Sequence, residues 1–193
     1  MNAGLANKWN HIYNQSNPVY SPATQVLIEN DFLLPTTGMA LDLASGWGAN
    51  AIFLAQRGLA VTALDISFVA IDKLTTYANQ QGLKINARQE KIVPESFTKS
   101  HFDVIVVSRF LDRTLSDAII GSLKPNGLLF YQTFTQEKIY SKSPNNPNYL
   151  LASGELLALF SGLKLVFYRE NASIGEALFG LRDEVQFVGQ KLI

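Results

Sequence analysis

Short apolar runs alternate with stretches of helical periodicity through the first two thirds of the chain. The runs predict five strands: Met39–Leu43, Ala60–Leu64, Leu83–Arg88, Phe102–Val107 and Leu128–Thr133. The intervening stretches predict helices over Asn50–Arg57, from a Ser67 cap to Gly82, and over Leu115–Leu123. Alternating strands and helices of this kind favour a parallel sheet with helical crossovers.

The last third of the chain has a different pattern. A polar loop spans 135–150, and Ser153 is predicted to cap a short helix that runs through Phe160. Strands follow over Leu163–Tyr168 and Val185–Leu192, with no helical pattern between them, so we expect them to pair antiparallel. The prediction is an α/β, Rossmann-like three-layer sandwich whose seven-stranded sheet is mostly parallel and ends in an antiparallel pair.

The N-terminal segment is polar and aromatic. Residues 1–35 contain Trp9, Tyr13 and Tyr20, and a helix is predicted around Pro22–Asn30. With 193 residues, the chain is expected to form a single domain over 1–193.

Composition narrows the classes of function. Sixteen basic residues balance sixteen acidic ones without a Lys/Arg run, so no nucleic-acid partner is expected. Cysteine is absent, and the two histidines, His11 and His101, lie in no ligand-like pattern, so no metal site is expected. No signal sequence or long apolar run is visible, which favours a cytoplasmic protein without a membrane partner. Nothing indicates the oligomeric state.

A glycine-rich turn follows the first predicted strand. Gly46-Trp47-Gly48-Ala49-Asn50-Ala51 fits the pattern G-x-G-x-x-A, in which glycines let the backbone approach a ligand. Asp65 ends the second strand, where a carboxylate accepts hydrogen bonds from ribose hydroxyls. The alternatives are a tight turn without a ligand and an Asp that caps a helix.

Asp42 lies inside the first predicted strand, where an unpaired charge would be costly. Two interpretations stay open. In the first, Asp42 accepts hydrogen bonds from loop N–H groups or, through water, from the ammonium group of a ligand. In the second, Asp42 has only the structural role of bracing the loop.

Several segments together resemble the class I S-adenosylmethionine (SAM)-dependent methyltransferases. They are LDLASGWGANAIFLAQRG, VTALDIS, FDVIVVSRFLDR, SLKPNGLLFYQTF, NPNYLLASGELLALF and the spacing of Trp9 and Tyr13. The resemblance is closest to small bacterial enzymes of the tellurite-resistance and thiopurine methyltransferase-like group. It implies SAM as cofactor, and five β/α units followed by an antiparallel pair is the sheet plan of these enzymes.

The resemblance also implies roles for individual residues. The loop under the methionine part of SAM would be formed by Ala44, Ser45, Gly46 and Gly48. Asp65 would bind ribose and Ile66 would pack on adenine, whose edge would face Gln89, Glu90 or Lys91. Ser108 and Arg109 would line the methyl-transfer pocket, and the N-terminal segment would cover the cofactor with Trp9 and Tyr13.

The loop departs from the group's pattern at three positions, Ser45, Trp47 and Ala49. The group carries a Gly-Cys or Ala-Cys pair, an acid between the glycines and an Arg after them. This chain has Ala44, Ser45, Trp47 and Ala49 in those places. The group's substrate therefore does not transfer to this chain.

No side chain is identified as the catalytic residue. Methyl transfer from a sulfonium is an in-line displacement that depends on alignment and exclusion of water. His11 is a candidate base or a surface histidine, and Arg109 would suit an anionic acceptor, the SAM carboxylate or a structural salt bridge. Arg113 is a member of the same cluster or a helix cap, and Gln132 and Thr133 shape the acceptor side.

The sequence thus predicts a SAM-dependent methyltransferase that acts on a small molecule, such as an oxyanion or a thiol. Two alternatives remain. One is a non-catalytic SAM-binding or scaffold protein on the same fold, since a fold alone does not establish catalysis. The other is an NAD-linked oxidoreductase, for which the chain has little room for a substrate domain.

Overall fold

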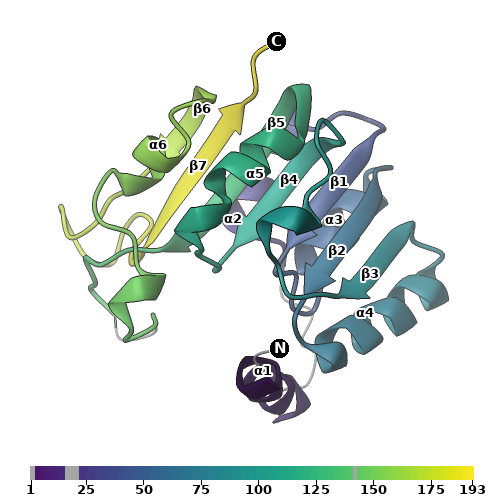
Figure 1. Ribbon diagram of the computed structural model, residues 1–193. Helices are drawn as coiled ribbons and strands as arrows, with labels where there is room; N and C mark the ends of the chain where they lie inside the picture. The colour runs from purple at the N-terminus through teal and green to yellow at the C-terminus, as the bar shows by residue number, and fades with distance from the viewer. Residues whose placement is uncertain (1–2, 16–21, 141–142) are drawn as a thin grey trace.

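The computed structural model describes residues 3–15, 22–140 and 143–193. Its centre is a seven-stranded sheet in the order β3-β2-β1-β4-β5-β7-β6, shown in Figure 1. The strands are β1 (Met39–Leu43), β2 (Ala60–Asp65), β3 (Ile85–Gln89), β4 (Phe102–Ser108), β5 (Leu123–Phe134), β6 (Lys164–Arg169) and β7 (Glu184–Gln190). The helices are α1 (Ala3–Gln15), α2 (Gln25–Glu29), α3 (Ala49–Gln56), α4 (Phe68–Gln81), α5 (Ser116–Ser122) and α6 (Glu155–Leu159).

Strand directions confirm the predicted fold class. The first five strands pair parallel, whereas β7 pairs antiparallel with both β5 and β6. The predicted antiparallel pairing of the last two strands is therefore correct. Because β7 inserts between β5 and β6, its polar residues lie directly opposite the carboxyl end of β5.

Two apolar cores separate the layers of the predicted sandwich. Leu41, Leu43 and Ile105 point to one face of the sheet, where they pack with residues of α5 and α6. Alternate strand residues point to the other face and pack with residues of α2, α3 and α4. Helices thus cover both faces, as Figure 1 shows, and α1 lies beside α4 near one edge of the sheet.

Helix α4 has the ends that its sequence predicts. The Ser67 hydroxyl accepts a hydrogen bond from Ala70 N, and Gly82 ends the helix with a left-handed φ of 62°. These caps fix the position of the connection between β2 and α4, and hence the position of Asp65.

Three local predictions need correction. Gly154, with a left-handed φ, is the N-cap of α6, and Ser153 is not. The predicted turn at 124–127 is a register shift within β5, where Asn126 has a φ of 65°. Helix α2 is shorter than predicted because the Thr24 side chain bonds to Gln132 instead of capping the helix.

The described helices were also compared with the requirements of a membrane span. None of them is long and apolar enough to cross a bilayer.

Candidate functional site

The carboxyl ends of the parallel strands bring the predicted site residues to one edge of the sheet. Asp42 lies in β1, Asp65 ends β2, Ser108 ends β4 and Gln132 lies near the end of β5. Ligands of open α/β sheets bind at this edge, next to the point where the strand order reverses. Here the reversal lies between β1 and β4.

The loop between β1 and α3 has an unusual backbone. Ala44, Gly46 and Gly48 have φ values of 56°, 50° and 78°. Glycine adopts this conformation freely, but a residue with a Cβ does so at a cost of about 1–3 kcal/mol. The loop holds the conformation through hydrogen bonds from Ser45 N to Leu64 O and from Gly48 N to Ser45 O.

Asp65 joins this loop to the end of β2. Its two carboxylate oxygens accept hydrogen bonds from Gly46 N and Ser67 N, both at 2.8 Å. The helix cap is the Ser67 side chain, so Asp65 is not the capping residue. Burial raises the pKa of the Asp65 carboxyl group. Each oxygen keeps a lone pair for a further donor, such as a ribose hydroxyl.

Asp42 is fully buried and braces the start of α3. Its carboxylate accepts hydrogen bonds from Ala51 N at 3.0 Å and from Asn50 Nδ2 at 3.3 Å. Burial raises the pKa of Asp42 to about 7, with a smaller contribution from the nearby charge of Asp65. The donors belong to the first turn of the helix, which favours the bracing interpretation of Asp42.

The two loop glycines serve different purposes. A Cβ on Gly48 would come within 2.3 Å of the Leu74 side chain, so Gly48 is required for packing. The three atoms nearest to a Cβ built on Gly46 belong to the Tyr13 side chain, whose hydroxyl would lie 2.6 Å away. The backbone at Gly46 therefore faces the space that Tyr13 fills. Nearby, the buried Ser45 hydroxyl has no hydrogen-bond partner among the described residues.

Aromatic side chains from α1 lie on the loop. The Tyr13 ring stacks on Trp9 at a centroid distance of 5.9 Å and meets the edge of Trp47 at 4.9 Å. Burial raises the pKa of the Tyr13 hydroxyl, and the charges of Asp65 and Asp42 raise it further. Tyr13 thus lies over the predicted cofactor loop, and Trp9 stacks on Tyr13.

Polar contacts anchor helix α1 to α4 and its cap, and one of them is the hydrogen bond from Lys73 Nζ to Tyr13 O at 3.3 Å. Asn10 Oδ1 accepts hydrogen bonds from the Ser67 hydroxyl at 2.7 Å and from Val69 N at 3.4 Å. The sequence analysis did not single out Asn10, because an Asn in a mixed helix carries no signal of its own.

The residues predicted at the adenine edge follow β2 and β3. Gln89 Nε2 donates to Ile66 O at 3.2 Å, and Glu90 N donates to Asp65 O at 2.8 Å. Glu90 also forms a 3.6 Å ion pair with Arg88, and Lys91 is exposed. Ile66, Gln89 and Glu90 therefore lie close to Asp65.

Arg109 lies on the other side of β1, beyond Ser108 at the end of β4. Its backbone is left-handed, with a φ of 52°, and its N–H donates to Gln132 O at 2.8 Å. Its Nε donates to Glu184 Oε1 at 2.9 Å, so the anticipated salt bridge is present. The Arg109 side chain nevertheless stays 65% exposed.

Arg113 and His11 do not join this cluster. Arg113 forms a fork with Glu155, at 2.5 and 3.0 Å, and also donates to the carbonyls of Asn148 and Leu150. It fastens the end of the polar loop to the turn before α5. His11 lies on an exposed part of α1, hydrogen-bonded to Gln15, so it has the placement of a surface histidine.

Glu184 and Asn50 are the main site residues that the sequence analysis missed. Glu184 is 7% exposed and Asn50 is 6% exposed. In the sequence, each of them is a polar residue at the edge of an apolar run. That pattern does not indicate which residues it contacts in the fold. In the described part of the chain, no group of three His, Asp or Glu side chains is placed to hold a metal ion.

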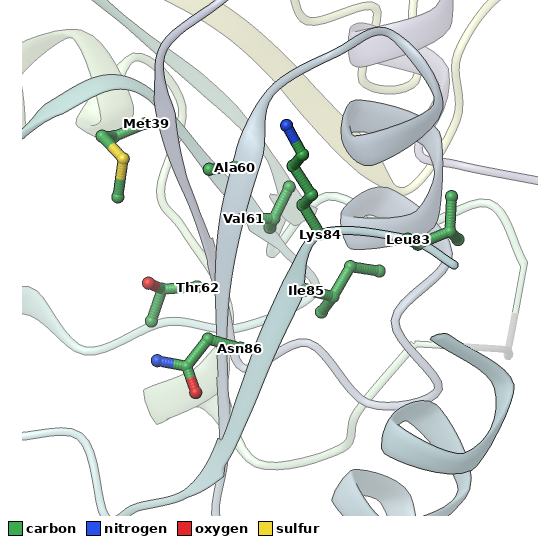
Figure 2. Close-up of a pocket in the computed structure, with 8 residues that line it drawn as sticks. All are labelled: Met39, Ala60, Val61, Thr62, Leu83, Lys84, Ile85 and Asn86. Carbon is green, nitrogen blue, oxygen red and sulfur yellow. The ribbon is translucent and has the colours of Figure 1, made fainter. Parts of the chain in front are cut away.

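An open hollow of about 370 Å³ lies elsewhere, at the amino ends of β1 to β3. Figure 2 shows Met39, Thr62 and Asn86 along one side of these strands. The hollow is at the opposite edge of the sheet from Asp42 and Asp65. We assign the functional site to the carboxyl edge, because the strained loop and the buried acids are there.

Comparisons with known proteins agree with this geometry. Residues 40–127 match the protein-family model described as Methyltransferase domain, which is slightly under half of the chain. The ubiquinone biosynthesis O-methyltransferase of Rickettsia felis is 30% identical over 103 residues, covering 51% of this chain and 42% of the relative. The chain thus spans less than half the length of that relative.

Solved structures match over more of the chain. TehB of Haemophilus influenzae has a TM-score of 0.71 at 17% identity, covering 95% of this chain and 67% of TehB. The cyclase SpnF has a TM-score of 0.67 at 14% identity, covering 95% of this chain and 81% of SpnF. The chain therefore shares its fold with these two proteins, and its central region matches a methyltransferase domain, which agrees with the function and cofactor expected from the sequence.

Proposed function

We propose that this chain, with a methyltransferase-type sheet and a central region that matches a methyltransferase domain, transfers a methyl group from SAM to a small molecule. The observation that carries the proposal is the contact between Gly46 N and Asp65 at the carboxyl ends of β1 and β2. It places the loop backbone that Tyr13 covers and a ribose-type acid side by side.

The residues present fit this cofactor. Gly46 has room for a ligand once the Tyr13 side chain shifts, the buried Ser45 hydroxyl lacks a partner among the described residues, and Asp65 has lone pairs to offer. We assign the methionine part to the loop of Ala44, Ser45, Gly46 and Gly48, with Asp42 bracing the helix behind it. We assign ribose to Asp65, and adenine to Ile66, Gln89, Glu90 and Lys91.

The chain's own part in the reaction is alignment. When bound, SAM supplies a methyl group on a positively charged sulfur, which is already activated for displacement. The loop would hold the amino-acid end, and Trp9 and Tyr13 would exclude water and present aromatic faces to the cation. We identify no general base, which suits an acceptor that arrives ionised.

The acceptor side is assigned to Ser108 and Arg109. A guanidinium at this position suits an acceptor with negatively charged oxygen. The relatives matched by sequence are named ubiquinone biosynthesis O-methyltransferases, and TehB is a neighbour in structure. We therefore propose an oxyanion or an ionised hydroxyl as the acceptor, and place the chain with the tellurite-resistance and thiopurine methyltransferase-like group.

Calorimetric titration tests the proposal. SAM and S-adenosylhomocysteine (SAH) should each bind with one site per chain, and NAD should give no heat of binding. A folded protein that binds neither SAM nor SAH would refute the proposal. Binding of NAD alone would instead support the oxidoreductase alternative.

A second candidate is a SAM-binding protein that does not transfer methyl groups. The similarity to SpnF supports this second candidate, because SpnF shares the fold of this chain but is named as a cyclase. Incubation with SAM carrying a labelled methyl group, together with selenite, tellurite, thiols and phenols, separates the two. Tight SAM binding without transfer of label to any of these classes favours the second candidate.

A further inference from the structure

Gln132 is the centre of a buried hydrogen-bond network beneath the acceptor side. Its Oε1 accepts from the Thr24 hydroxyl at 2.9 Å, from Val26 N at 2.9 Å and from Gln186 Nε2 at 3.1 Å. Its Nε2 donates to Glu184 Oε2. Gln132 is 4% exposed, so each of these bonds forms away from bulk water, where an unpaired polar group is costly.

Glu184 carries the network from Gln132 to Arg109. One carboxylate oxygen accepts from Gln132 and the other accepts from Arg109 Nε at 2.9 Å. The backbone N–H of Arg109 donates to the Gln132 carbonyl at 2.8 Å, so Gln132 contacts the Arg109 backbone directly and the Arg109 side chain through Glu184.

Backbone strain lies at both ends of the ion pair. Arg109 has a φ of 52°, and Asp183, directly before Glu184, has a φ of 61°. Such conformations are costly for residues other than glycine, and they persist at functional sites where the surroundings fix them. Among the described residues, the hydrogen bond of the Arg109 side chain is made by Nε, which leaves both terminal nitrogens on an exposed fork.

We infer that Gln132 and Glu184 are positioning residues, which hold the Arg109 guanidinium so that its two terminal nitrogens face a negatively charged group of the methyl acceptor. The inference rests on the proposed function for the identity of the site. Through Thr24 and Val26, the same network ties the start of α2 to this guanidinium.

Arginine Nε–H signals in heteronuclear NMR spectra test the inference without a known acceptor. In the wild-type protein, Arg109 Nε–H should exchange slowly with water because Glu184 accepts its hydrogen bond. Gln132→Leu should speed that exchange about tenfold or more. Without Gln132, Glu184 is held less firmly, and its hydrogen bond to the charged Arg109 guanidinium is weakened. Arg113 Nε, which is paired with Glu155, should keep its signal and serves as the internal control.

Gln190→Leu is the matched control, because Gln190 lies at the other end of β7. If Gln132→Leu fails to fold, Glu184→Gln keeps the side-chain shape and should also accelerate exchange at Arg109. A folded variant of either kind with unchanged exchange at Arg109 would overturn the inference.

SAH binding, measured on the same samples, reports separately on the proposed function. Once an acceptor is known, Gln132→Leu should raise its KM and leave the KM for SAM unchanged.

Discussion

Asp42 and Asp65 have different surroundings although both are buried acids at the carboxyl edge. Asp42 is enclosed by donors from α3, and its oxygens face the helix that it braces. Asp65 joins the loop to β2 and lies beside the Tyr13 hydroxyl, on the side where a ligand would enter. We therefore expect substitutions of the two acids to have different effects.

Asp65→Asn should weaken SAH binding about tenfold or more, since an amide gives ribose hydroxyls a poorer acceptor than a carboxylate. Isothermal calorimetry measures the change. Asp103→Asn is the matched control, because Asp103 accepts from Met39 N and Lys124 at the opposite edge of the sheet. Equal affinities for wild type and Asp65→Asn would rule out the ribose assignment.

Asp42 should make the stability depend on pH. Its pKa in the folded protein is about 7, above its ordinary value of 3.8, so the folded state holds a proton that the unfolded state releases. This contribution to stability is complete below pH 4 and is lost as pH rises through 7. Asp42→Asn should therefore reduce the fall in the free energy of unfolding between pH 5 and 8, measured in urea. The fall should not vanish, because the pKa of Asp65 is also raised. Identical pH profiles would contradict the account.

Sequence could predict the positions of the acids of β1 and β2, because Asp42 lies within an apolar strand before the glycine turn and Asp65 ends the next strand. It could not predict Glu184 as the partner of Arg109. The two are 75 residues apart, and their contact depends on the register between β5 and β7. Asn50 was missed for a similar reason, since its role is set by Thr24 in a distant segment.

At the scale of elements, α1 and the loop after β1 form one aromatic cluster. The chain has two tryptophans, Trp9 and Trp47, and both flank Tyr13. SAH binding should therefore change the tryptophan emission, because Tyr13 must shift from the backbone of Gly46. Tyr13→Ala should change the emission of the free protein and reduce the effect of SAH. Saturation with SAH by calorimetry without any change in emission would contradict this placement of α1.

The fork between Arg113 and Glu155 fastens the end of the polar loop to the turn before α5. Arg113→Gln should lower stability by about 1 kcal/mol, a modest value because both side chains are partly exposed. The unfolding midpoint should fall by about 2–4 °C. SAH affinity should be unchanged, since the fork is separate from Arg109. A large loss of SAH affinity in the folded variant would show that Arg113 belongs to the site.

Element types were predictable from periodicity, but some boundaries were not. Serine is a common helix N-cap, but the N-cap of α6 is Gly154 and not Ser153. The backbone at that position is left-handed, a conformation that glycine adopts freely. The sequence of residues 124–127 predicts a turn. In the structure these residues form an irregularity within β5, between two stretches that pair with β4. Both differences depend on tertiary pairing that local sequence does not contain.

At the scale of the whole molecule, the sheet order places β2, which ends at Asp65, and β4, which precedes Arg109, on opposite sides of β1. Alternating strands and helices, followed by a strand pair without a helix, were enough to predict the fold class and the antiparallel pair, but not the insertion of β7 between β5 and β6. The order 3-2-1-4-5-7-6 brings Asp65 to one side and Arg109 with Glu184 to the other. In the proposed function, the methyl donor would bind on the Asp65 side and the acceptor on the Arg109 side, and the two would meet in line.

A crystal structure with SAH tests the central claim most directly. The account predicts SAH at the carboxyl edge, with its ribose hydroxyls on Asp65, its amino-acid end on the loop at Gly46 and its sulfur facing the side of Arg109. SAH bound in the hollow at the amino ends of β1 to β3, or bound at the carboxyl edge without contact to Asp65, would contradict it.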